Sequence, residues 1–202
     1  MKNSVVIVGA GGHAKVVCDI ILKNHHRVVG FLDDYKSEND MIFGYPILGR
    51  ISQWKDFQKE HQFIVAIGDN KTRKRIVEML KVQWYTAVHP HASIGLNTTI
   101  GAGTAVMAGA VINADAQIGN HVIINSQSVV EHDCRIGDYS HISPNAVLAG
   151  RVCIGECVHI GAGAAVKDGI NIVSDVIVGL GAAVVKELDR SGVYIGVPAR
   201  KL

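Results

Sequence analysis

Every sixth residue in the second half of the chain is aliphatic. The series contains only Val, Ile and Leu through seventeen consecutive positions, from Val88 to Val184. Helices repeat every 3.6 residues and strands every 2, so neither produces a strict period of six. A parallel β-solenoid does, because each six-residue rung is one short strand and one turn, and stacked rungs bury the same side chain. We therefore predict a solenoid over this region.

The position four residues after each aliphatic residue is nearly always small, from Thr98 to Ala182. Three stacked faces that close a triangular prism leave room for one large inward side chain in each rung and for small ones beside it. The 22 glycines and the low aromatic content of 5% also fit a solenoid built from tight turns.

Residues 1–84 follow a different pattern. Apolar runs alternate with a glycine-rich turn and amphipathic stretches, which is typical of a βαβ domain with a parallel sheet. The expected order is strand, turn, helix, strand, strand and helix, at residues 4–8, 9–13, 14–23, 27–32, 63–67 and 71–80. This is about one half of a dinucleotide-binding fold. We expect a half-Rossmann domain over 1–84 and the solenoid domain over 85–202, with a closing segment that begins near Lys186.

Composition narrows the possible partners. Hydrophobic residues make up 48% and charged residues 19% of the chain, which favours a packed, soluble protein. The formal net charge of +2 argues against a nucleic-acid surface. No apolar run approaches the length of a membrane helix, and residues 1–3 lead into a strand rather than a signal peptide, so we expect a cytoplasmic location. The four cysteines have no metal-ligand spacing, and we expect reduced, buried thiols and no metal.

The turn Gly9-x-Gly11-x-x-Ala14 follows a strand and opens a helix. Glycine permits close approach of a phosphate, and the start of the helix supplies amide donors and a partial positive charge. Asp33, at the end of the second expected strand, stands where a carboxylate can accept a ribose hydroxyl. The order of these features favours a diphosphate-linked ligand over a turn made only for packing. Whether that ligand is a dinucleotide or a nucleotide-sugar stays open.

His132 is the most informative ionisable residue, because it lies between Glu131 and Asp133. Neighbouring carboxylates hold an imidazole in one tautomer, which is how a general base is built. The simpler interpretation is a solvated surface histidine in a solenoid coil. His141 lies nine residues further on, half a coil away if three hexads make one coil. No nucleophile stands beside a base, which favours direct transfer over a covalent acyl-enzyme.

Taken together, the hexads, the Gly-Ala-Gly-Gly-His turn, the Asp33-Asp34 pair, the Glu-His-Asp triplet and the closing Gly-Val-Pro-Ala-Arg resemble a known family. It is the family of bacterial left-handed β-helix acetyltransferases of the sialic acid O-acetyltransferase type. The family includes N-acetyltransferases that act on UDP-, GDP- or dTDP-linked 4-amino-dideoxy sugars, such as the bacillosamine pathway enzyme. The resemblance covers essentially the whole chain and implies a homotrimer, with acetyl-CoA between neighbouring solenoids and the nucleotide-sugar on the N-terminal domain.

The resemblance also implies roles for individual residues. His132 matches the family's general base, and Asp133 matches the acidic residue that supports it. His141, Ala162 and Leu180 match positions that contact acetyl-CoA, although relatives carry Ile and Gly at the last two. The positions that match the nucleotide-sugar site are Gly11, Gly12, His13, Asp33, Asp34 and Gly68. Arg200 stands where many relatives have Lys, which keeps a cation near the CoA phosphates.

Three functions compete at this point. The first is an acetyl-CoA-dependent N-acetyltransferase acting on the 4-amino group of a nucleotide-linked amino-dideoxy sugar, for surface glycan or glycoprotein biosynthesis. The second is an O-acetyltransferase for sialic acid or a similar sugar hydroxyl. The third is a solenoid scaffold without catalysis. The glycine turn with Asp33 favours the first function, and the lack of a second mononucleotide half disfavours a nicotinamide-dependent reductase.

Overall fold

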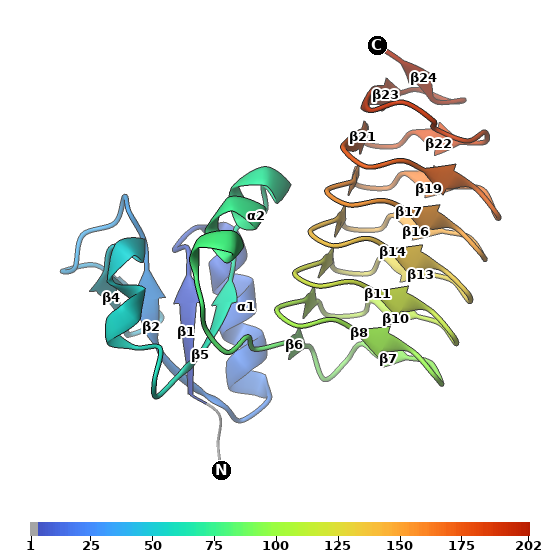
Figure 1. Ribbon diagram of the computed structural model, residues 1–202. Helices are drawn as coiled ribbons and strands as arrows, with labels where there is room; N and C mark the ends of the chain where they lie inside the picture. The colour runs from blue at the N-terminus through green and yellow to red at the C-terminus, as the bar shows by residue number, and fades with distance from the viewer. Residues whose placement is uncertain (1–3) are drawn as a thin grey trace.

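A computed structural model describes residues 4–202, so the expectation for residues 1–3 lies outside the described part. An α/β region stands beside a tall parallel solenoid (Figure 1). The elements of the α/β region are β1 Ser4–Val8, α1 Gly12–Lys23, β2 Arg27–Leu32, β3 Met41–Ile42, β4 Tyr45–Gly49, a 3₁₀ helix at Ile51–Asp56, β5 Gln62–Val65 and α2 Asn70–Met79. Within residues 4–202, no helix is both long enough and apolar enough to cross a membrane.

The sheet of the α/β region has five strands in the order β3-β4-β2-β1-β5. Strand β1 is central and pairs in parallel with both β2 and β5, as its continuous apolar run requires. The predicted strands and helices are all present, within a few residues. The sequence analysis did not find β3, β4 or the 3₁₀ helix. Strand β4 extends the sheet in parallel beyond β2, and β3 folds back on it as an antiparallel edge.

The hexads form a solenoid with three faces, and equivalent residues in successive coils lie 18 apart, as Val111 and Val129 do. The domain face turns toward the α/β region and consists of β6 Ala87–Val88, β9 Ala105–Val106, β12 Ile123–Ile124, β15 His141–Ile142, β18 His159–Ile160 and β21 Val176–Val178. The open face consists of β7 Ser93–Ile94, β10 Val111–Ile112, β13 Val129–Val130, β16 Val147–Leu148, β19 Ala165–Val166 and β22 Ala183–Val184. The polar face consists of β8 Thr99–Ile100, β11 Gln117–Ile118, β14 Arg135–Ile136, β17 Cys153–Ile154 and β20 Asn171–Ile172.

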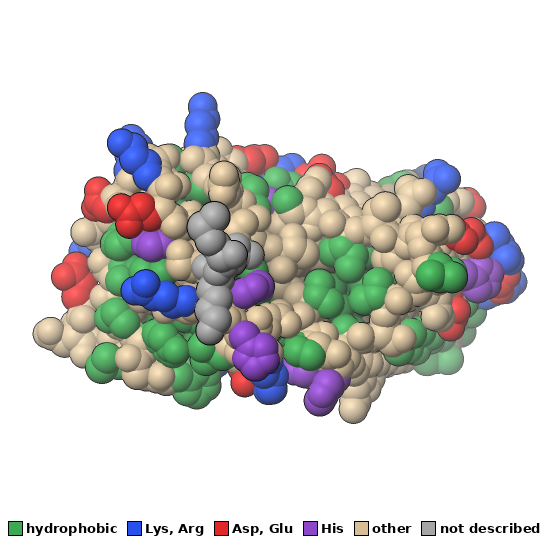
Figure 2. Space-filling model, turned by 90° about the horizontal axis from the view of Figure 1, so that it is seen from below, with side chains coloured by type: hydrophobic (Ala, Val, Ile, Leu, Met, Phe, Trp, Pro, Cys, Tyr) green, Lys and Arg blue, Asp and Glu red, His purple; other side chains and the backbone are tan. Residues whose placement is uncertain are grey.

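The aliphatic series forms the solenoid core. From Val106 to Val184 every member is at most 5% exposed. The first coil is the exception, since Ile94 is 40% exposed there because no earlier coil covers it. Seen from below, where the first coil lies, hydrophobic side chains gather at this uncovered end (Figure 2). At the other end β23 Gly192–Ile195 and β24 Arg200–Lys201 extend the domain face and close the last coil, as the closing segment predicts.

One residue of every turn has a left-handed backbone, at a fixed six-residue spacing from Asn97 to Gly181. Glycine adopts this conformation without strain, and Asn and Asp tolerate it better than other residues. Asp133, with φ 60°, occupies one of these positions, so its place in the turn has a structural reason apart from chemistry.

Arg73 joins the two parts of the molecule. It lies on α2, is 1% exposed, and donates hydrogen bonds to several backbone carbonyl oxygens and to the side-chain oxygen of Asn70. Its Nη1 binds the Ile67 carbonyl at 2.8 Å, while Nε and Nη2 reach the solenoid at the carbonyls of His121, 2.8 Å away, and Tyr139, 2.6 Å away. Burial lowers the pKa of Arg73 to about 10, so the guanidinium stays charged at neutral pH. Asn70 adds bonds to the carbonyls of Cys157 and Val158.

We predict that Arg73→Met destabilises the protein by about 3 kcal/mol, because several buried carbonyl groups lose their donor. Differential scanning calorimetry or urea unfolding measures the effect. Arg75→Met, an exposed position on the same helix, is the control and should unfold like the wild type. Equal stability of the two variants would contradict the role given to Arg73.

Candidate active site

The glycine-rich turn is held by the ends of the neighbouring strands. Gly9 donates to the Leu32 carbonyl at 2.8 Å, and the Ala10 amide donates to Asp33 Oδ2 at the same distance. Gly9 has φ 101°, and a Cβ there would lie 2.8 Å from Ile67, so both its backbone and its packing need glycine. The first glycine of the turn therefore has a structural role.

Gly11, Gly12 and Gly68 are different. A Cβ at any of them would meet nothing within 4 Å, and none has a left-handed backbone. Gly11 is the N-cap of α1, and no side chain caps the amides of the first turn. Free helix amides beside open space form an anion-binding position. The open space beside these glycines is where the sequence analysis expects the nucleotide-sugar.

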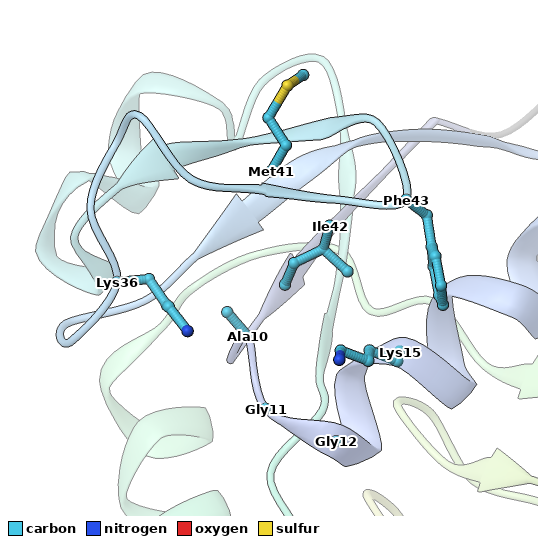
Figure 3. Close-up of a pocket in the computed structure, with 8 residues that line it drawn as sticks. All are labelled: Ala10, Gly11, Gly12, Lys15, Lys36, Met41, Ile42 and Phe43. Carbon is cyan, nitrogen blue, oxygen red and sulfur yellow. The ribbon is translucent and has the colours of Figure 1, made fainter.

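Two cavities flank the turn. All six residues of the predicted nucleotide-sugar set line one cavity of about 390 Å³: Gly11, Gly12, His13, Asp33, Asp34 and Gly68. Helix α2 contributes Thr72 and Arg75, which the sequence analysis did not assign to the site. A second cavity of about 430 Å³ shares Gly11 and Gly12, and Lys15 and Lys36 approach it beside the β3–β4 hairpin (Figure 3).

The two acidic residues of the pair differ in their partners. Asp33 accepts hydrogen bonds from three backbone amides, those of Ala10, Tyr35 and Lys36. Its carboxylate thus orders the turn and the following loop, which is more than the ribose contact predicted for it. Asp34 Oδ1 accepts from the Ile51 amide at 3.0 Å. Both residues line the same cavity.

His13 and His141 face the boundary between the α/β region and the solenoid. Burial lowers the pKa of His13 to about 4, with a further contribution from Arg73. His141, on β15, is partly buried, and the desolvation lowers its pKa to about 3, assisted by His159 and Arg73. Both rings are therefore neutral at physiological pH. Within residues 4–202, His13 Nε2, His121 Nδ1 and His141 Nδ1 are buried ring nitrogens without a side-chain hydrogen-bond partner.

The ring of His141 is fixed by two coils. It stacks on His159, with centroids 4.8 Å apart and an interplanar angle of 19°. Asn125 lies one coil earlier, and its Nδ2 is 3.0 Å from His141 Nε2. Ser143 stands in the same relation to His159, with Oγ 2.9 Å from Nε2. The sequence analysis left His159 and Asn125 without a role. Their 18-residue spacing from His141 and Ser143 was the signal that could have found them.

His132 and Asp133 lie on the corner between the open and polar faces, in the turn from β13 to β14. His132 Nδ1 is 2.7 Å from Asp133 Oδ2, and the side chains are 51% and 54% exposed. Glu131 does not share this contact, since its Oε2 accepts from Asn113 Nδ2 at 2.8 Å. The side chains of His132 and Asp133 are therefore in hydrogen-bonding contact, as the predicted pair requires.

One chain does not bring the predicted residues together. His132 lies on the corner opposite the domain face, whereas His141 lies on the domain face itself, as half a coil implies. Ala162 and Leu180 lie on a third position, the corner between the domain and open faces, and Leu180 is 83% exposed. The chain thus carries a cavity lined by His13 and the other predicted nucleotide-sugar residues, His141 on the domain face, and two further corners separated by the open face.

Comparisons with known proteins agree with this architecture. Residues 4–80 match the PglD N-terminal domain, and residues 97–132 and 133–168 match the bacterial transferase hexapeptide repeats. Among curated proteins, a UDP-N-acetylbacillosamine N-acetyltransferase of Bacillus subtilis is 39% identical over 112 residues, which are 52% of this chain and 50% of that protein. An uncharacterized protein, L142, of Acanthamoeba polyphaga mimivirus is 39% identical over 121 residues, 59% of this chain and 24% of that protein. The chain thus spans half or less of these curated relatives.

Solved structures match over the whole chain. The acetyltransferase domain of PglB from Neisseria gonorrhoeae superimposes with a TM-score of 0.93 at 32% identity and covers 100% of both chains. PerB from Caulobacter crescentus, in complex with CoA and GDP-perosamine, has a TM-score of 0.94 at 38% identity over 99% of this chain and 97% of PerB. The chain belongs to the family of hexapeptide-repeat sugar acetyltransferases with a PglD-type N-terminal domain. Its fold is the left-handed parallel β-helix with a small α/β region that the resemblance implied.

We predict that Gly11→Val raises the KM for the nucleotide-linked acceptor strongly and leaves acetyl-CoA affinity nearly unchanged, because the new side chain would project into the cavity. Steady-state kinetics and calorimetric titration with CoA measure the two effects. Gly9→Ala is the contrasting variant, since it should lower Tm through strain at φ 101°. An equal loss of CoA affinity in Gly11→Val would contradict the separation of the two ligands.

Proposed function

We propose that this protein is an N-acetyltransferase that moves the acetyl group of acetyl-CoA to the 4-amino group of a nucleotide-linked amino-dideoxy sugar, in surface glycan or glycoprotein biosynthesis. The observation that carries the proposal is the cavity at the uncapped start of α1, whose wall includes His13, a neighbour of His141 on the domain face. The full-length likeness to PerB, whose structure holds CoA and GDP-perosamine, supports both ligand classes.

The α/β region suits the nucleotide half of the acceptor. The amides of the first turn of α1 would receive the diphosphate beside Gly11 and Gly12, and Arg75 and Lys15 add positive charge near the same cavities. Asp33 and Asp34 directly follow β2 in the wall of the same cavity, where carboxylates would receive nucleoside hydroxyl or amide groups. The neutral rings of His13 and His141 then border the sugar end, toward the solenoid.

The chemistry is assigned to His132. Its Nε2 would take a proton from the acceptor amine while the amine nitrogen attacks the thioester carbonyl carbon of acetyl-CoA. Asp133, bound to Nδ1, keeps the ring in the tautomer that leaves Nε2 free to accept this proton. A C–N bond forms, the C–S bond breaks, and CoA leaves as the thiolate, which the imidazolium reprotonates. A backbone N–H of the solenoid would stabilise the oxyanion. Transfer is direct, without an acyl-enzyme and without a metal.

A complete site needs a second copy of the chain. The outward side chains of the open face carry no charge and are small or apolar: Ser93, Val111, Val129, Val147, Ala165 and Ala183. On the domain face the α/β region already covers Ala87, Ala105 and Ile123. Three open faces around one axis would bury this surface. They would also set His132 of one copy beside the corner of the next copy that carries Ala162 and Leu180, with acetyl-CoA between them.

O-acetylation of sialic acid or a similar hydroxyl uses the same base and the same cofactor groove, so the acceptor decides between the two reactions. The nucleotide cavity favours a nucleotide-bearing amine. UDP-, GDP- and dTDP-linked 4-amino sugars, each supplied with acetyl-CoA, test this by release of free CoA and by mass spectrometry of the product. Turnover of sialic acid, with none of the nucleotide-linked amines accepted, would favour O-acetylation. A protein that turns over none of them would favour a scaffold.

We predict that His132→Ala lowers kcat by about 10²–10⁴, the usual effect of removing one positioned base. KM for both substrates should change little, since the imidazole acts mainly in the transition state. Asp133→Asn should cost less than His132→Ala. Glu131→Gln is the matched control, because its carboxylate contacts Asn113 instead, and it should retain wild-type kcat. Wild-type turnover in His132→Ala would remove this residue from the mechanism.

We predict a homotrimer in solution, measured by analytical ultracentrifugation. Val147→Glu, in the middle of the open face, should yield smaller species and lose activity with them, because a buried carboxylate without a partner is costly. Gln117→Glu introduces the same charge on the polar face and should remain trimeric and active. A wild-type monomer with full activity would refute the proposal that neighbouring chains share the site.

A further inference from the structure

The side chain of His132 lies against a glycine of the next coil of the solenoid. The residue 18 positions further on, which lies above it in the same corner, is Gly150. A Cβ built on Gly150 would lie 2.7 Å from His132 Nε2, 2.8 Å from Cε1 and 3.4 Å from Cδ2. The three nearest atoms all belong to one imidazole. The ring therefore occupies the space that any side chain at position 150 would need.

The backbone does not explain this glycine. Gly150 has no left-handed φ, unlike the glycines at the turn positions six residues apart, such as Gly163 and Gly169. The corner column to which Gly150 belongs also accepts side chains of several kinds, since its other members are Leu96, Ala114, His132 and Asp168. Glycine is needed at position 150 only because His132 lies in the preceding coil.

Two contacts thus hold the imidazole from different directions. Asp133 binds Nδ1 at 2.7 Å within the same turn, and the Nε2 side of the ring fills the space that a Cβ of Gly150 in the next coil would take. Gly150 is itself buried, although the His132 ring beside it is half exposed. A half-exposed ring with only one hydrogen bond would otherwise be free to rotate away, and a general base is effective only when the accepting nitrogen stays in place.

We propose that Gly150 is a positioning residue for the transfer reaction, and that the absence of its side chain lets the His132 ring lie across two coils with Nε2 held at the reacting centre. The inference rests on the proposed function, in which His132 is the base. It adds a requirement that the general-base assignment does not contain, namely that position 150 must have no Cβ.

Gly150→Ala tests the inference. A methyl group at 2.7 Å from Nε2 must displace the ring, and because the ring is exposed it can swing outward without disturbing the core. We expect kcat to fall by about 10- to 100-fold, since displacement of about 1 Å costs up to that much. Tm and both KM values should stay near the wild type. Asp168→Ala, one coil further along the same column, is the control and should keep wild-type kcat.

A double variant separates positioning from general damage. On a His132→Ala background, Gly150→Ala should reduce the residual activity no further, because the ring it displaces is gone. Added imidazole should restore part of the activity of His132→Ala, and less of it when Gly150→Ala fills the vacated space. Wild-type kcat in Gly150→Ala, with His132→Ala inactive, would overturn the positioning role and leave the base assignment standing. Full activity in His132→Ala would overturn both.

Discussion

The hydrogen bonds of the buried Arg73 guanidinium fix the position of the α/β region relative to the solenoid. It donates to the carbonyls of Ile67 and Gly68, which line the cavity of the α/β region, and to those of His121 and Tyr139 in the solenoid. A rigid, planar cation with several donors can bind carbonyls on both sides of an interface at once, which a lysine cannot do. The cavity and the histidines of the domain face are therefore held in one fixed relation, and a ligand that spans them meets a preformed surface.

In the solenoid, equivalent positions of successive coils form columns, and the contacts of a side chain are mainly within its column rather than with its neighbours in sequence. A side chain is packed mainly against residues 18 positions before and after it, as in the stack of His141 on His159. An imidazole ring in the solenoid can therefore have one contact from its own turn and a second contact from the neighbouring coil. His132 does this with Asp133 and Gly150, while the Asn125 contact of His141 comes from the preceding coil. The strict repeat makes such contacts geometrically regular, so a single missing Cβ has a defined consequence.

Residue patterns predicted the elements with strong periodicity and missed the weak ones. The hexads, the buried run of β1 and the turn before α1 were all predicted correctly. Positions that are buried at regular intervals require apolar residues at the same intervals in the sequence. Strands β3 and β4 were not found, since two residues in one and Pro46 in the other leave no readable alternation. The roles of Arg75 and His159 were also missed. Each role depends on a neighbour that is distant in sequence. A local pattern of residue types does not show which distant residues lie close in space.

The sequence by itself determined the solenoid, the glycine turn and the identity of the ionisable groups, because a six-residue repeat of aliphatic side chains has only one compact solution. Tertiary structure decided which glycines serve the backbone and which leave space, since Gly9 and Gly11 look alike in sequence but only Gly9 meets a neighbouring side chain. It also decided that Glu131 turns away to Asn113, so that only Asp133, the residue the resemblance implied, contacts His132, and that His141 is partly buried and neutral on the domain face. The physical reason is that burial, pKa and hydrogen bonding depend on which coil and which domain lie against a residue.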